Sequence, residues 1–355
     1  CSCCPDSSNR VPELDWNVCE RRIGIVSTAM KIIVGKRLKF KELKKNAKDA
    51  RTRAHYDSMQ LALKWLGVCS FGYLGFNNAK FGRIDAHIGV CAWDRKILLA
   101  SARIAERGGF KVIHGIVDCL WVRKESADES DYLKLASEIQ AETGFEISFE
   151  GVYKWIAFVP SKVTSMLPVL NRYYGAYRNG ELKVRGIEAR RHDTPLIFSR
   201  CQMEILSLLA KADSVEEAKE MIPDCVDIFV RYAMAIQNQE VPIEQMVFTR
   251  NISKKPDEYT SRTVEAGVAK QLAREGVELH AGEQVRYVIT DYCSTSSERR
   301  AVAFDLADGR TAYDSRRYIE LLAEVCSAIL EPFDRRCRAE RMLQVFENEN
   351  HILAM

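Results

Sequence analysis

Apolar residues recur at the spacing of amphipathic helices along residues 24–50 and 53–67, and neither stretch contains many helix-breaking residues. The residues between them, 46–53, read as a reversal, so the pattern predicts an antiparallel pair of helices. The stretch GVCSFGYLG, residues 67–75, is punctuated by glycines and marks the end of this helical pattern.

Two further helices are expected later in the chain. One covers residues 94–107, starts at Asp94 and is followed by two glycines, and the other covers 131–143, lies behind Ser130 and ends at Gly144. Asp and Ser are common helix N-caps, and glycine often follows the last helical turn.

The stretch GFKVIHGIVDCLWVRKE, residues 109–125, lies between these helices and is rich in β-forming residues on both sides of Asp118. It predicts a hairpin with its turn at 115–118, and a carboxylate in this apolar run is costly unless a partner or a metal compensates it. Two more strands are expected at 145–150 and 152–159. The alternation of helices and hairpins predicts an α+β fold.

After Pro195 the pattern becomes mostly helical, which places a domain boundary near 190–195. Ser214 and Glu217 have the spacing of a capping box at the start of one of these helices. The helix that directly follows Pro195 carries four apolar residues on one face: Ile197, Cys201, Ile205 and Leu208.

The composition is that of an ordinary globular protein of 355 residues, with 47% hydrophobic and 28% charged residues, long enough for two or three domains. No apolar run approaches the roughly 20 residues of a membrane span, and no signal-peptide pattern opens the chain. A cytoplasmic location is therefore expected. Because the first residue is Cys1, we expect a fragment or a processed chain.

Most of the twelve cysteines stand singly in apolar contexts and are interpreted as core residues in a reducing compartment, not as a disulfide framework. This interpretation covers Cys69, Cys91, Cys201, Cys225 and Cys326. At the amino-terminal end, a zinc site is the alternative to a frayed terminus, although the spacing lacks the usual ligand pairs. Its ligands would be Cys1, Cys3, Cys4 and Cys19.

The net charge is only +3, but it is unevenly distributed. Residues 31–53 contain ten Lys or Arg against Glu42 and Asp49, which gives 10 − 2 = +8. Such a run is either a solvated helix face or a surface for a polyanion, such as a nucleic acid backbone or nucleotide phosphates.

Four motifs occur in the order seen in family B DNA polymerases, and the chain resembles the fingers, later palm and thumb of that family, most closely its divergent second archaeal group. The motifs are DSMQLALKWLGVCSFGYLGF (57–76), GFKVIHGIVDCLWV (109–122), VRGIEARRHD (184–193) and FTRNISKKPDEYTSRTVEAGVAKQLAREG (248–276). The resemblance implies helical-hairpin fingers, an antiparallel-sheet palm and a mostly helical thumb. The corresponding divisions are 1–23 as the lead-in to the palm, 24–68 as fingers, 69–193 as palm and 194–355 as thumb.

In the fingers, the resemblance assigns Arg37, Lys41 and Lys64 to the incoming triphosphate, with Lys64 also catalytic. Arg37 and Lys41 are spaced i, i+4, so they share one helix face. Lys64 opens the family motif K-x3-N-S-x-Y-G. Phe71 stands at the nucleotide-binding tyrosine position of that motif, and Val68 and Cys69 replace its Asn and Ser.

The palm hairpin of the family reads Y-x-D-T-D-S, and residues 114–119 match it with Ile116 in place of the first Asp and Asp118 in place of the second. The resemblance makes Asp118 a catalytic metal ligand, with Glu150 as a further palm carboxylate. It implies two Mg²⁺ ions, held in part by an Asp that is not in this chain. The alternative is a turn aspartate that caps its own hairpin.

The thumb and the palm–thumb segment of the family contact the primer–template duplex, mainly through its phosphates. Each of these positions taken alone is also compatible with a solvated surface charge. The residues assigned to DNA are Arg185, Arg190, Arg191, Arg250, Lys254, Lys255, Arg262 and Lys270.

Two functions follow from the resemblance. One is a DNA-directed DNA polymerase, associated with the nucleoid and binding dNTPs and primer–template DNA. This chain alone is expected to be inactive, because the amino-terminal part with the other palm Asp was either removed or sits on another polypeptide. The other is a polymerase-derived DNA-binding or assembly protein that has lost catalysis. Ile116 and Val68 favour the second function, whereas the kept charged residues favour the first.

Overall fold

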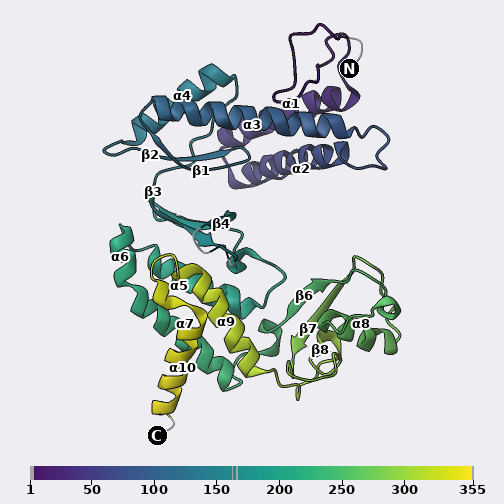
Figure 1. Ribbon diagram of the computed structural model, residues 1–355, viewed down its shortest axis with the longest axis vertical. Coiled ribbons are helices and arrows are strands. Elements are labelled where there is room, and N and C mark those ends of the chain that lie inside the picture. The colour runs from purple at the N-terminus through teal and green to yellow at the C-terminus, as the bar shows by residue number, and fades with distance from the viewer. Residues whose placement is uncertain (1–3, 162, 165–166, 354–355) are drawn as a thin grey trace. The chain divides into compact units, whose positions relative to one another are not determined.

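The computed structural model describes residues 4–161, 163–164 and 167–353 (Figure 1). The chain divides into two compact units, with the boundary between Phe149 and Glu150. This division falls inside the stretch assigned to the palm. The finer division into fingers, palm and thumb stays a prediction. No helix among the described residues has the length and apolar character needed to cross a membrane.

The first two helices of the chain are the predicted pair, α1 (Ile25–Asn46) and α2 (Ala50–Leu74). Asp49 caps α2 by accepting a hydrogen bond from the Thr52 N–H at 2.8 Å. The two helices are antiparallel, and Lys44 Nζ lies 2.7 Å from Asp57 Oδ1 across them.

The glycine-rich stretch 67–75 does not end α2 where the sequence pattern placed its end, since the helix continues to Leu74. A Cβ at Gly67 would lie 3.5 Å from Met30 Cε, so this glycine faces α1 in close packing. A glycine inside a helix costs only about 1 kcal/mol, which neighbouring contacts can offset.

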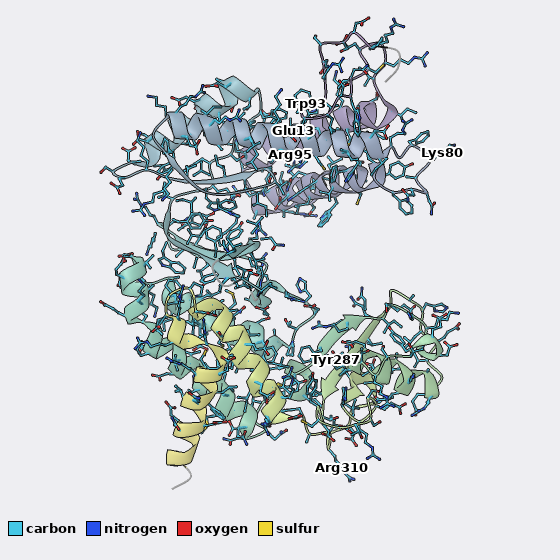
Figure 2. The ribbon with its side chains drawn as sticks, in the orientation of Figure 1. Glu13, Lys80, Trp93, Arg95, Tyr287 and Arg310 are labelled. Carbon is cyan, nitrogen blue, oxygen red and sulfur yellow. The ribbon has the colours of Figure 1, made fainter. Side chains whose placement is uncertain are left out.

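Helix α3 (Ile84–Arg107) begins ten residues before Asp94, so the predicted start is wrong and Asp94 lies in the helix interior. The amino-terminal segment is tied to α3 by an ion pair between Arg95 and Glu13 at 2.6 Å (Figure 2). The predicted hairpin follows as β1 (Lys111–Ile116) and β2 (Cys119–Arg123), paired antiparallel.

Helix α4 (Glu129–Thr143) ends at Gly144 as predicted, with φ of 76°, but its N-cap is Asp128 and not Ser130. The predicted strand at 145–150 is wrong. This segment has no strand partner; Phe149 stacks on Tyr132 at 6.3 Å between ring centroids. The small core of this unit consists of Ile104, Ala105, Phe110, Leu135 and Ile139.

The second unit opens with an antiparallel sheet of β3 (Tyr153–Pro160), β4 (Pro168–Tyr177) and β5 (Leu182–Arg185). Strand β3 confirms the predicted strand at 152–159. The backbone at Gly151 has φ of 148°, and a Cβ there would lie 3.2 Å from the Tyr177 ring. Glycine therefore permits the close approach of the chain to that ring.

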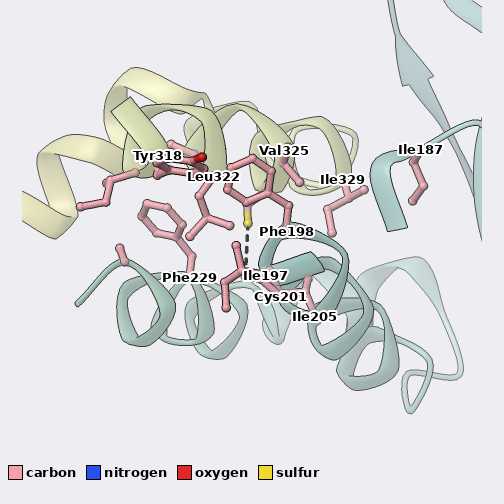
Figure 3. Packing of buried hydrophobic residues seen from close by; sticks show 14 of the residues in the cluster. Ile187, Ile197, Phe198, Cys201, Ile205, Phe229, Tyr318, Leu322, Val325 and Ile329 are labelled. Atoms are coloured by element: carbon pink, nitrogen blue, oxygen red, sulfur yellow. Dashed lines mark hydrogen bonds between the residues drawn. The ribbon is translucent and has the colours of Figure 1, made fainter. Parts of the chain in front are cut away.

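A helical core follows the sheet, as predicted after Pro195: α5 (Leu196–Leu209), α6 (Val215–Glu220), α7 (Ile222–Gln237), α9 (Ser315–Leu330) and α10 (Ala339–Leu353). Three members of the predicted apolar face, Ile197, Cys201 and Ile205, are buried in this core (Figure 3), and Leu208 is half-buried. Ser214 caps α6, but Glu217 accepts from the Asp213 N–H, so the predicted reciprocal box is only half formed.

A second antiparallel sheet lies beside this core and was not predicted: β6 (Phe248–Asn251), β7 (Gln284–Ile289) and β8 (Ala301–Ala303), with helix α8 (Val264–Arg274) packed on it. Single 3₁₀ turns connect other elements, at Glu188–Arg190, Ile243–Gln245, Pro256–Glu258, Phe304–Leu306 and Arg335–Cys337.

The prediction that these cysteines are core residues is confirmed in the second unit, where Cys201, Cys225 and Cys326 are buried. It is wrong in the first unit, because Cys69 on α2 and Cys91 on α3 are exposed. Both helices present a large share of their surface to solvent, so a cysteine in an apolar sequence context does not reach a core there.

Candidate functional site

The hairpin of β1 and β2 carries Asp118 in its turn. The register pairs Ile116 with Cys119, so only Val117 and Asp118 form the turn, and Val117 has φ of 50°. The predicted turn, 115–118, was therefore too long. Asp118 is exposed, and the Cys119 thiol lies 3.4 Å from its Oδ1. The expected cost of burying this carboxylate is thus absent, and the carboxylate is accessible to a ligand.

The same turn geometry bears on where Ile116 lies relative to Asp118. Ile116 ends β1, whereas Asp118 lies outside both strands. Strand alternation, which would place two residues at positions i and i+2 on one side, therefore does not relate these two side chains.

Asp94 was missed as a neighbour of Asp118 because the sequence pattern placed it at a helix start. Helix α3 packs on the hairpin, where a Cβ at Gly115 would lie 3.7 Å from a Leu98 methyl. Asp94 precedes Leu98 by one helical turn and is half-buried. Burial, followed by the charge of Asp118, raises the pKa of Asp94 above its usual value. No pattern in the sequence indicates this neighbour, because it depends on the packing of α3 on the hairpin.

The donor set at this turn consists of carboxylate oxygens, which are the ligands that Mg²⁺ prefers. Within the described ranges, no group of three or more His, Cys, Asp or Glu side chains is arranged to hold a metal ion. An octahedral ion at Asp118 would therefore take its other ligands from water, phosphate or a residue outside this group.

Glu150 lies in the second unit and is already engaged. Its Oε2 accepts hydrogen bonds from Lys183 Nζ at 2.7 Å and from the Tyr177 hydroxyl at 3.2 Å. The hydrogen bond from Lys183 holds the pKa of Glu150 below its usual range. Glu150 and Asp118 belong to different compact units, so the expected metal role of Glu150 stays a prediction.

The cations of the helical pair are open to a ligand. Lys41 on α1 and Lys64 on α2 are exposed, and neither they nor Arg37 form an ion pair with a described residue. The Arg37 Nε is buried without a hydrogen-bond partner. Phe71 keeps 38% of its surface exposed and stacks on His87 with centroids 4.2 Å apart. A buried donor without an acceptor is costly. This Nε is closed to solvent, so it is not itself a contact for an anion from solution.

The eight predicted DNA-contacting cations divide into two groups. Arg191 and Arg250 both pair with Asp193, at 2.6 and 2.9 Å. In the part of the chain that the structure describes, the other six form no ion pair within 4.0 Å, and Lys270 donates only to the Tyr259 carbonyl at 3.4 Å. These six are Arg185, Arg190, Lys254, Lys255, Arg262 and Lys270.

Arg262 and Lys270 line a polar cavity of about 480 Å³ at the start of α8. The remaining lining residues all carry hydroxyl groups and were missed from the sequence: Thr260, Ser261, Thr295, Ser296 and Ser297. Gly267 lets α8 pack closely against the segment that contains Ser297, because a Cβ at this position would lie only 2.4 Å from the Ser297 carbonyl oxygen. Two cations and several hydroxyls at one cavity suit an anionic ligand such as a phosphate.

The proposed zinc ligands Cys1 and Cys3 lie outside the described residues. Cys4 and Cys19 are described, and both are partly buried. The zinc site therefore stays a prediction.

The sequence and the structure of the chain are similar to those of the same family of known proteins. A sequence model described as DNA polymerase family B matches residues 6–333. The chain is 26% identical over 306 residues to a DNA polymerase of Archaeoglobus fulgidus, covering 86% of this chain and 37% of that protein. It is also 26% identical over 348 residues to a DNA polymerase of Pyrococcus glycovorans, covering 94% and 43%.

A solved structure, the family B DNA polymerase of Pyrobaculum calidifontis, superimposes with a TM-score of 0.54 at 26% identity. The match covers 89% of this chain and 38% of that structure. The chain thus spans about 40% of the length of the proteins that it resembles.

Proposed function

The chain belongs to DNA polymerase family B, and on that premise we propose that it carries the fingers, later palm and thumb of a DNA-directed DNA polymerase. The reaction would transfer a nucleotide from a dNTP to a primer 3′ hydroxyl. The observation that carries this proposal is the exposed Asp118 carboxylate at the tip of the β1–β2 hairpin, at the position of the second aspartate of the family motif.

Arg37, Lys41 and Lys64 would bind the triphosphate. A nucleoside triphosphate carries about four negative charges, and charge-assisted hydrogen bonds to phosphate are among the stronger polar contacts. The lack of ion pairs between these three cations and described residues supports this role, because no carboxylate of the described chain competes with phosphate for these charges. Phe71 would lie beside the nucleotide as an apolar surface.

Asp118 would hold Mg²⁺, with the partner carboxylate supplied from outside this sequence. When bound, a pair of such ions activates the primer hydroxyl and neutralises the charge of the leaving pyrophosphate. Asp118 itself contributes a fixed negative charge at an accessible turn. Glu150 is a weaker candidate for the same site, because Lys183 already compensates its charge.

The second unit would bind the primer–template duplex. Its six cations without an ion pair to a described residue, and above all the hydroxyl-lined cavity at Arg262 and Lys270, suit backbone phosphates. Such contacts hold the duplex without reading its sequence. Arg191 and Arg250 would act differently, since both are held by Asp193 and support the local structure.

The alternative is a DNA-binding or assembly protein derived from a polymerase. Ile116 favours it, because an isoleucine at the position of the first motif aspartate supplies no metal ligand. Val68 favours it as well, since it replaces a polar residue of the fingers motif.

Primer extension distinguishes the two functions. The chain is assayed with Mg²⁺ and dNTPs, alone and with an amino-terminal fragment of a family B polymerase. We expect no extension by the chain alone, extension with the fragment, and loss of that extension in Asp118→Asn. Undiminished extension by Asp118→Asn would contradict the metal role of Asp118, and DNA binding with no extension in any mixture would favour the alternative.

The duplex-binding role has its own matched pair of variants, Arg262→Ala and Arg250→Ala. Arg262→Ala should weaken binding to any duplex and lower the slope of log K against log salt by about one unit, since one phosphate contact is lost. Arg250→Ala should leave that slope unchanged, because Asp193 and not phosphate is its partner. Equal slopes for Arg262→Ala and the unmodified chain would contradict the role of the cavity.

A further inference from the structure

Two thiols meet in the core of the second unit. The Cys201 Sγ on α5 lies 3.5 Å from the Cys326 Sγ on α9, the contact drawn as a dashed line in Figure 3. Both residues are completely buried. The neighbouring buried cysteines, Cys225 and Cys337, make no sulfur hydrogen bond with any described residue. The pair is therefore distinct from the other core cysteines.

The backbones on either side of the pair are fixed in register. Gln202, next to Cys201, donates from its side-chain amide to the carbonyl of Val325, next to Cys326, at 2.8 Å. Ile205 and Leu322, one turn away on each helix, are completely buried. A disulfide bond is about 2.05 Å long, so the sulfurs would need to approach by roughly 1.5 Å. Side-chain rotation or a small shift of the two helices would supply this movement.

We propose that Cys201 and Cys326 form an intramolecular disulfide when the chain meets a low-molecular-weight disulfide oxidant. One thiol loses its proton, attacks a sulfur of the oxidant and releases one thiol product. The second cysteine, as a thiolate, then attacks the protein sulfur of the mixed disulfide and releases the second thiol product. In sum, two protein thiols are oxidised to one disulfide, and one oxidant disulfide is reduced to two thiols.

The burial of the pair decides when this reaction occurs. Burial, followed by the hydrogen bond with Cys201, raises the pKa of the Cys326 thiol well above its usual value. Thiolate is the attacking species, so the folded core reacts slowly. The bond therefore forms during folding or local opening. Once formed, it is shielded from reductants by the same burial.

The cross-link would close a long loop. Residues 201 and 326 are separated by 125 positions, and the segment between them holds α6, α7, α8 and the whole β6–β7–β8 sheet. A cross-link over so long a loop removes many conformations from the unfolded chain, so its stabilising effect lies toward the upper end for disulfides. It would turn a contact within the core into a covalent tie between α5 and α9.

The test uses the full chain and needs no polymerase activity. The protein is partly unfolded in denaturant, oxidised with glutathione disulfide and refolded, and a second sample receives a reductant throughout. We expect a peptide pair linking Cys201 to Cys326 by mass spectrometry. We also expect a melting temperature about 5–10 °C above that of the reduced sample.

Three variants sharpen the test. Cys201→Ser and Cys326→Ala should each abolish the linked peptide and the difference in melting temperature, whereas Cys225→Ser, equally buried in the same core, should keep both. Absence of the Cys201–Cys326 peptide in the unmodified chain would overturn the proposal. So would cross-links that form only among exposed cysteines such as Cys69, Cys91 and Cys293.

Discussion

The two compact units differ in how much of each helix they bury. Helix α1 of the first unit is 22 residues long and buries none of them, whereas α9 of the second unit buries Tyr318, Leu322, Cys326 and most of the same face within 16 residues. On α2, Trp65 remains 65% exposed. Regions with few buried apolar contacts open at low free energy. The unit with the proposed triphosphate cations is therefore the less rigid of the two, and the unit proposed to hold the duplex is the more rigid.

The largest expected effect comes from removing a core side chain of α9. Leu322 is completely buried, and Leu322→Ala should lower the free energy of unfolding of the second unit by about 2–5 kcal/mol. The matched change in the first unit is Ile32→Ala on α1, where the side chain is 58% exposed, and it should change stability by about 0.5 kcal/mol or less. Urea unfolding of both variants measures the difference. Similar losses would mean that α1 is buried in solution.

A pair of helical glycines should give effects of opposite sign. In Gly267→Ala the new Cβ would meet the Ser297 carbonyl oxygen at 2.4 Å, a backbone atom that cannot move aside cheaply. We expect a loss of about 1–3 kcal/mol. In Gly35→Ala, inside α1, the Cβ meets nothing within 4 Å, and helix propensity should raise stability by about 0.5–1 kcal/mol. Thermal melts of the two variants and the unmodified chain measure the two changes in stability. A higher melting temperature for Gly267→Ala would contradict the close packing of α8.

The smallest effect concerns pH. Lys183 lowers the pKa of Glu150, so this pair stabilises the second unit above the unfolded pKa, about 4.5, and the stabilisation is lost as pH falls through the lowered folded value. Lys183→Met should therefore destabilise most at neutral pH, with a difference below about 1 kcal/mol that shrinks between about pH 5 and 3, because the Glu150 side chain is 56% exposed.

The control for this prediction lies in the first unit. Arg107 and Glu142 form an ion pair with 64% and 52% of their side chains exposed, and Arg107→Met should change stability less than Lys183→Met does. Denaturant unfolding at several pH values compares them. A constant difference between Lys183→Met and the unmodified chain across that range would show that Lys183 acts by packing alone.

The sequence predicted the local features of the fold well, since helical periodicity and capping act over a few residues. The pair α1–α2, the β1–β2 hairpin and α5 all followed from such patterns. The sheet β6–β7–β8 did not, because its strands are three to six residues long and pair across gaps filled by α8 and loops. Short strands carry little alternation, and their pairing depends on distant partners. For segment 145–150 the sequence predicted a strand that does not form. Its residues alternate like those of a strand, but the segment packs on α4.

The candidate site was predictable to a similar degree. Asp118 and the cations of α1 and α2 were found by their motif positions, yet their surroundings were not. That Asp118 is exposed depends on the two-residue turn, and that Arg191 and Arg250 share Asp193 depends on the contact between two segments some sixty residues apart. Asp94 became a neighbour of Asp118 only through the packing of α3 on the hairpin.

The contact between α5 and α9 has a consequence for synthesis of the chain. Helix α9 covers apolar residues of α5 and α7 such as Phe198 and Phe229, but it lies more than a hundred positions after α5. During synthesis, α5 and α7 emerge from the ribosomal exit tunnel well before α9 does. During that interval their apolar faces have no permanent cover, and they are exposed to aggregation or to chaperones. A pause in translation before α9 has left the exit tunnel should therefore lower the yield of folded protein more than a pause after it has left.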